Sequence, residues 1–105
     1  MKRGEIWTLR NSNYASKARP VVIIQSDKYL FDSVILSLFT SYKSENIVTR
    51  LKIKPTDKNG LNKTSYVMTD KIISFNKKLL NEKIGELLSE EMKLLSEKLK
   101  QILDI

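Results

Sequence analysis

The sequence contains no cysteine and no histidine, and these two absences exclude several kinds of site. Without cysteine there can be no disulfide and no thiolate metal site. Without histidine the chain lacks the most common zinc ligand and the most common general base at neutral pH. The composition therefore excludes a histidine-pair ribonuclease, a Ser-His-Asp hydrolase and a His-ligated metal centre. We expect no cofactor.

Long apolar runs are also lacking. No segment approaches the length of a transmembrane helix, and no signal-peptide-like apolar region precedes the first predicted strand. We therefore expect a cytoplasmic protein without membrane association. The 105 residues fit one domain, residues 1–105. Hydrophobic residues make up 41% of the chain and charged residues 30%, which is typical of a folded globular domain.

Positive charge is in excess and is unevenly distributed. The net charge is +7. Residues 1–80 contain 15 Lys and Arg against 6 Asp and Glu, whereas residues 81–105 contain 4 against 6. Such a field attracts polyanions and accelerates their encounter with the protein. The charge alone fits nucleic-acid binding and a merely lysine-rich, soluble protein equally well.

Hydrophobic periodicity predicts a β-rich chain that ends in a helix. Alternating or continuous apolar segments with β-branched residues predict strands over residues 5–9, 21–24, 33–40, 48–53, 64–69 and 71–75. We expect the stretch around Gly85 to form a short connector. Ser89 is the predicted N-cap of an amphipathic helix with apolar positions at Met92, Leu95, Leu99, Ile102 and Leu103. The fold class is thus mainly β with α (α+β), as a small, strongly bent barrel carrying a C-terminal amphipathic helix.

Several distinctive segments follow one another along almost the whole chain. They are Lys2-Arg3-Gly4-Glu5-Ile6-Trp7, the "RPV" strand Ala18-Arg19-Pro20-Val21-Val22-Ile23-Ile24-Gln25, the strand 34–41 ending Phe39-Thr40-Ser41, Gly60-Leu61, the strand 65–72 with Asp70, and Ile84-Gly85-Glu86-Leu87. In this order they resemble the MazF/PemK family of small dimeric toxins that cleave RNA. The resemblance implies an SH3-like barrel of the CcdB/PemK type.

The resemblance also implies three catalytic residues, Arg19, Thr40 and Asp70. A guanidinium offers a permanent charge and a planar fork of donors that suits phosphate oxygens, and fixed donors of this kind stabilise a phosphorane. The Thr40 hydroxyl could donate to a phosphate oxygen or orient the attacking 2′-hydroxyl, or it could simply satisfy nearby backbone. Asp70 could orient Arg19 through a salt bridge, act as general base, or form a plain ion pair with a lysine.

Substrate contacts are expected from the first loop and from the end of the third strand. Unpaired bases commonly stack on aromatic side chains, although each tyrosine could equally be a packing residue. The expected substrate-binding residues are Asn13, Tyr14, Ser16, Lys17, Ser41 and Tyr42, with Lys43, Arg50, Lys52 and Lys54 on the basic surface.

The chain departs from the family pattern at two places. The first loop is short and lacks the histidine that some relatives carry there. After Asp70, Ile73 stands where many members have an arginine. These differences leave open which groups transfer protons, and they also permit a barrel that binds RNA without cutting it.

We therefore expect the toxin of a type II toxin–antitoxin system, a sequence-selective and metal-independent endoribonuclease acting on single-stranded RNA. The resemblance implies a homodimer, products with 2′,3′-cyclic phosphate and 5′-hydroxyl ends, and neutralisation by a MazE-like antitoxin with an acidic tail. Two alternatives stay open. One is a CcdB-like, non-enzymatic gyrase poison on a similar fold, and the other is a catalytically inactive RNA-binding barrel.

Overall fold

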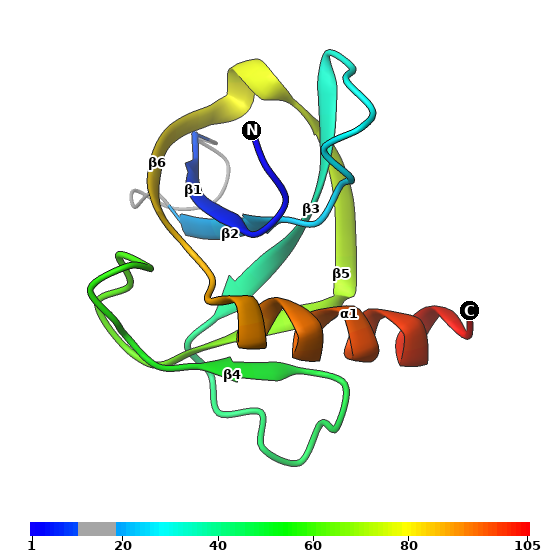
Figure 1. Ribbon diagram of the computed structural model, residues 1–105. Coiled ribbons are helices and arrows are strands. Elements are labelled where there is room, and N and C mark those ends of the chain that lie inside the picture. Colours follow the sequence, from blue (N-terminus) through cyan, green and yellow to red (C-terminus); the bar gives the residue numbers. More distant parts are fainter. Residues whose placement is uncertain (11–18) are drawn as a thin grey trace.

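A computed structural model describes residues 1–10 and 19–105 of the chain (Figure 1). Within these residues, six strands are followed by one helix, with a single 3₁₀ turn between the last two strands. The elements are β1 (Glu5–Leu9), β2 (Arg19–Ile23), β3 (Ser33–Thr40), β4 (Leu51–Ile53), β5 (Ser65–Asn76), η1 (Lys77–Leu79), β6 (Leu80–Glu86) and α1 (Ser89–Leu103). The predicted α+β class, with a C-terminal amphipathic helix, is confirmed.

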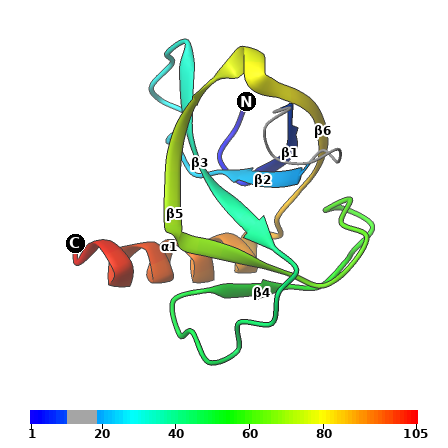
Figure 2. The ribbon, with the colours of Figure 1, turned by 180° about the vertical axis from the view of Figure 1, so that it is seen from behind.

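The six strands form one antiparallel sheet in the order β4-β5-β3-β2-β1-β6. Figures 1 and 2 show β6, β1, β2, β3 and the upper part of β5 curling into a ring, with α1 crossing below it. Within the described residues the outer strands β4 and β6 do not pair with each other, so the sheet is an open, strongly curled one and not a closed barrel.

β5 is a single long strand where the sequence predicted two. Its pairing with β3 passes from Ser37↔Ile72 directly to Leu38↔Met68, so three residues of β5 lie in the register shift. Asp70 is the central one of these three residues. A bulge of this kind bends a strand and increases its twist. The break expected near Asp70 is therefore a bend in one strand. It lets the later part of β5 run in the ring while its first residues pair with β4.

Three other boundaries differ from the sequence-based expectations. The stretch around Gly85 is not a connector but part of β6, an edge strand with few apolar residues whose period-2 pattern is correspondingly weak. The fourth strand begins only at Leu51, because residues 48–50 form a turn. Ser89 is the first helical residue and Leu88 the N-cap, whose N–H donates to the carboxylate of Glu91 at 2.9 Å.

Two hydrophobic clusters lie on opposite faces of the curled sheet. β2 contributes to both, because neighbouring side chains of a strand point to opposite faces. One cluster lies between the sheet and α1 and consists of Ile6, Val22, Phe39, Leu51, Ile53, Leu61, Val67, Leu87, Leu95 and Leu99. The other fills the ring and consists of Leu9, Val21, Ile23, Val34, Leu36 and Leu80.

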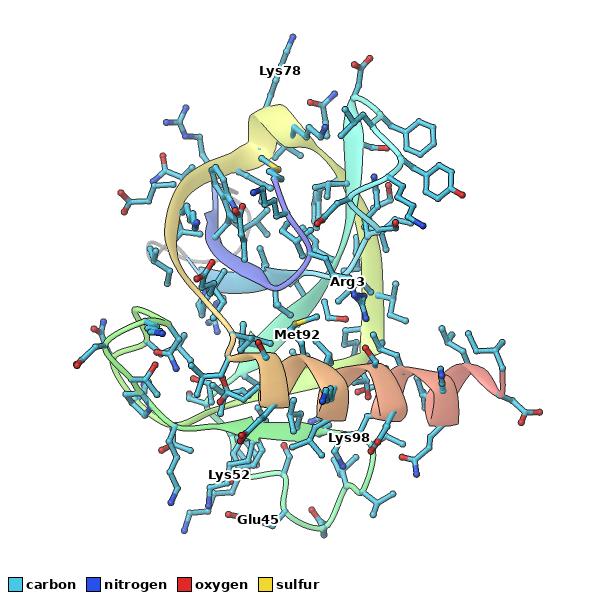
Figure 3. The ribbon with its side chains drawn as sticks, viewed as in Figure 1. Arg3, Glu45, Lys52, Lys78, Met92 and Lys98 are labelled. Carbon is cyan, nitrogen blue, oxygen red and sulfur yellow. The ribbon has the colours of Figure 1, made fainter. Side chains whose placement is uncertain are left out.

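The helix is only partly covered by the sheet. Leu95 and Leu99 are buried and Met92 is half-buried, and Figure 3 shows Met92 between α1 and the ring. Ile102 and Leu103 from the predicted apolar stripe are exposed at the C-terminal end. In the part of the chain that the structure describes, no helix has the length and apolar character needed to span a membrane.

Candidate active site

Arg19 and Thr40 lie at adjoining strand ends. Arg19 is the first residue of β2 and Thr40 the last residue of β3. β2 and β3 pair antiparallel through Val21↔Leu38. Continuing that register by two residues places Arg19 opposite Thr40. The strand register therefore brings the predicted arginine and threonine to the same end of the sheet.

Two hollows meet at these strand ends, and both are lined by Arg19, Pro20, Phe39 and Thr40. The first, of ≈ 230 Å³, is otherwise lined by apolar side chains, namely Leu9, Leu38, Met68 and Phe75. The second, of ≈ 530 Å³, is more polar and is completed by Ser41, Leu61, Asn62, Lys63 and Ser65. An apolar hollow beside a cationic, hydroxyl-rich one can hold a flat ring and an anionic group side by side.

The Thr40 hydroxyl is held by its local backbone and is half-exposed. Its Oγ1 accepts a hydrogen bond from the backbone N–H of Tyr42 at 3.1 Å. That contact is the local one that strand-end threonines commonly make, and it occupies one lone pair of the oxygen. The hydroxyl proton can still be donated to a ligand, and the fixed lone pair limits the directions in which it can point.

Asp70 lies elsewhere and does not pair with Arg19. Its carboxylate receives two hydrogen bonds from Arg50, Nε to Oδ1 at 3.1 Å and Nη2 to Oδ2 at 3.2 Å, and it also pairs with Lys71 at 3.4 Å. The Arg50 hydrogen bonds lower the pKa of the Asp70 carboxyl below its usual value. Of the expected roles, the ion pair is the one observed, although its main partner is an arginine.

The other predicted contact residues divide into three groups. Asn13, Tyr14, Ser16 and Lys17 lie outside the described residues. Ser41 lines the polar hollow. Tyr42 follows it in the chain but is 81% exposed and does not line either hollow, so it remains available as an exposed ring.

The segment between β4 and β5 forms the loop that its polar sequence predicts, but its part in the site was not predicted. This loop brings Asn62 and Lys63 to the polar hollow, more than 40 positions along the chain from Arg19. The Asn59-Gly60 pair in this loop is typical of a turn and gives no sign of a site. The fully buried Asn59 side chain is the reason for the loop's shape, because it bonds three backbone groups around itself.

The described lining of the two hollows includes the cations Arg19 and Lys63 and no carboxylate. Two positive charges in a lining that also carries hydroxyl and amide groups fit a phosphodiester. Within residues 1–10 and 19–105, no three Asp or Glu side chains gather as they would around a metal ion.

Proteins of similar sequence identify the family of this chain. The family model of PemK-like, MazF-like toxins of type II toxin–antitoxin systems matches residues 2–103. The chain belongs to this toxin family. A curated relative, "Probable endoribonuclease MazF" of Mycolicibacterium smegmatis, is 34% identical over 94 residues, which cover 88% of this chain and 86% of the relative. The resemblance predicted from the sequence is thereby confirmed.

Solved structures share the fold of this PemK-like toxin. A mycobacterial endoribonuclease in complex with its cognate antitoxin superposes with a TM-score of 0.84 at 23% identity, covering 100% of this chain and 96% of the other. A MazE–MazF structure from Deinococcus radiodurans gives a TM-score of 0.79 at 16% identity, with coverage of 100% and 96%. At these identities the comparison supports the fold of the toxin and does not by itself assign its residues.

Proposed function

We propose that this endoribonuclease toxin cleaves single-stranded RNA at the two hollows that Arg19 and Thr40 line together. The observation that carries the proposal is the lining of both hollows by the same guanidinium and the same hydroxyl. The toxin family and the 34% identical relative named an endoribonuclease support the reaction class. The basic excess of residues 1–80 supports a polyanionic substrate.

In the proposed reaction the 2′-oxygen of the substrate attacks the adjacent phosphorus and the bond to the 5′-oxygen breaks. The 2′-hydroxyl loses its proton to a base, and the 5′-oxygen leaves with a proton, giving a 2′,3′-cyclic phosphate and a 5′-hydroxyl. Negative charge develops on the non-bridging oxygens, where Arg19 supplies fixed N–H donors and Thr40 supplies an O–H donor. No metal ion takes part in this scheme.

Asp70 is not the base in this scheme. A carboxylate whose pKa is lowered by two guanidinium hydrogen bonds is a weaker proton acceptor than a free one. The residues that we propose for substrate contact are Ser41 and Lys63 at the polar hollow, the exposed ring of Tyr42, and the first-loop residues Asn13, Tyr14, Ser16 and Lys17.

The proposed partners are an antitoxin and a second copy of the chain. A MazE-like antitoxin with an acidic segment would neutralise the toxin by occupying the same basic end of the sheet. In support, one solved structure of this fold is a complex with a cognate antitoxin and another is a MazE–MazF structure. We propose a homodimer, supported by the exposed Leu94, Ile102, Leu103 and Ile105 on and just beyond α1. The proposed location is the cytoplasm, where single-stranded RNA is available.

The test is cleavage of a long unstructured RNA by purified protein in the presence of EDTA. We expect cutting by the wild type and a loss of at least about 100-fold for Arg19→Ala, the scale seen when one oxyanion-stabilising donor is removed. Arg10→Ala is the matched control, because Arg10 is an exposed arginine that bonds Asn81 and does not line either hollow.

Each alternative function gives a different result in this assay. A gyrase poison leaves the RNA intact and does not bind it. An inactive RNA-binding barrel retards the RNA in a gel without cutting it. Full activity of Arg19→Ala would show that cleavage occurs elsewhere and would refute the proposed site.

A further inference from the structure

A continuous series of hydrogen bonds joins Asp70 in the bend of β5 to Thr40 at the end of β3. Asp70 is bound by both arms of the Arg50 guanidinium. Arg50 Nη1 donates to Ser44 Oγ at 3.1 Å, and Ser44 Oγ donates to the carbonyl oxygen of Tyr42 at 2.9 Å. The N–H of Tyr42 donates to Thr40 Oγ1 at 3.1 Å.

The series runs through residues 41–50, the loop between β3 and β4. Ser44 is only 2% exposed, although a serine in a surface loop would ordinarily be solvated, and its hydroxyl both accepts one hydrogen bond and donates one. The side chain of Arg50 is 16% exposed, so solvent competes little for its donors. The middle of the series, Ser44 and Arg50, is thus shielded from solvent, whereas its ends at Asp70 and Tyr42 are exposed. Shielded polar groups that have found their partners favour one conformation.

The same loop is also bonded at other points, to side chains of β4, β5 and α1. The Tyr66 hydroxyl donates to Glu45 at 2.7 Å, and Glu45 pairs with Lys52 at 3.6 Å. Figure 3 shows Glu45 and Lys52 close together below the helix, with Lys98 of α1 pointing toward the loop, where its Nζ donates to the Val48 carbonyl at 2.5 Å. The far part of the loop is therefore held independently, and the Asp70 series acts on the part next to Thr40.

We propose that Asp70 and Arg50 are positioning residues, which hold the loop after β3 so that the Thr40 hydroxyl points into the hollow shared with Arg19. This inference rests on the proposed function, because it assigns Thr40 its orientation in that site. It gives Asp70 a part in cleavage without contact to the substrate and without proton transfer. The bidentate geometry requires an arginine opposite a carboxylate, because a lysine or an amide cannot form both bonds.

The decisive variant is Ser44→Ala, which breaks the series while leaving the Asp70–Arg50 pair in place. Steady-state cleavage of a short fluorescent RNA should show kcat reduced about tenfold, with KM changed less than twofold. Asp70→Asn should give the same loss. The kcat of the double variant should be no lower than that of either single variant, because both changes break the same series of hydrogen bonds. Lys71→Ala is the control and should cleave normally, since Lys71 pairs with Asp70 outside the series.

A role of Asp70 as general base predicts different results. In that case Ser44→Ala would cleave like the wild type, the two changes would combine multiplicatively, and Arg50→Lys would move the acidic limb of the kcat–pH profile to higher pH. We expect that limb to stay in place in Arg50→Lys and in Ser44→Ala. Any of the three contrary results would overturn the inference.

A second readout does not depend on activity. The Tyr42 amide should exchange its hydrogen at least about fivefold faster in Ser44→Ala and Asp70→Asn than in the wild type or Lys71→Ala, as followed by NMR. If the wild type cuts RNA and Tyr42 exchanges alike in all four proteins, only this inference is overturned. If the wild type does not cut RNA, the proposed function fails first, whatever Tyr42 shows.

Discussion

Replacement of the buried Asn59 should destabilise the protein strongly, because its side chain bonds three backbone groups. It is fully buried in the loop between β4 and β5. Its Oδ1 accepts hydrogen bonds from the N–H of Thr56 at 3.1 Å and of Leu61 at 3.0 Å, and its Nδ2 donates to the Lys54 carbonyl at 2.8 Å. One side chain thus replaces the backbone pairing that this irregular loop cannot make for itself.

Asn59→Ala removes three hydrogen bonds, each with a net contribution of about 1 kcal/mol. Water can reach the freed groups of the exposed Thr56 and Lys54, but the N–H of the buried Leu61 is left without a partner, which adds roughly 1 kcal/mol. We expect the free energy of unfolding to fall by about 3–4 kcal/mol. That is a large part of the total of roughly 5–15 kcal/mol typical of such domains.

The assay is urea denaturation followed by the fluorescence of Trp7, the only tryptophan of the chain. The midpoint should fall while the slope stays unchanged, because the folded state buries the same surface. Asn62→Ala is the matched control, an exposed asparagine three positions later that should change stability by less than about 0.5 kcal/mol. A loss below about 1 kcal/mol for Asn59→Ala would refute the argument that its three bonds hold the loop.

Two further predictions concern charge. The folded-state pKa of Asp70 is lowered from its ordinary value of 3.8, so its ion pair stabilises the protein fully above that value, and the stabilisation is lost as the pH falls through the lowered pKa. Below about pH 4, the unfolding free energy of Asp70→Asn should therefore fall less steeply with pH than that of the wild type. Parallel curves for the two proteins in acid titrations monitored by circular dichroism would contradict this. Lys63→Ala should raise the KM for RNA a few-fold and reduce the salt dependence of binding by about one phosphate contact, as measured by fluorescence anisotropy across a salt series, and an unchanged slope would remove Lys63 from the RNA-binding surface.

Much of the fold followed from local patterns. Strands 5–9 and 33–40 were predicted to their last residue, because their side chains alternate or are β-branched and turn residues bound them. β6 was missed because an edge strand needs few apolar residues. The bend at Asp70 appeared in the sequence only as a break between two short strands, since a register shift depends on the partner strand and leaves little local signature.

The proposed site was predictable to a similar extent. Arg19 and Thr40 came from a family resemblance, and the sheet register then placed them together. The partner of Asp70 could not be predicted, because Arg50 lies 20 positions away in a segment expected to be a strand. The Lys63 contribution depends on a loop shape set by Asn59, and a buried asparagine cannot be distinguished from a solvated one by sequence alone.

The position of the two proposed catalytic groups explains how an open site can still be rigid. Two residues inward from Arg19 the strand is fully buried at Val21, and one residue inward from Thr40 it is buried at Phe39. The separation of the backbone at Arg19 and Thr40 is thus set by core packing and strand register, not by a contact between the two side chains. That leaves the space between them open to a phosphodiester. On this backbone frame, the series of hydrogen bonds from Asp70 acts on the rotation of the Thr40 side chain.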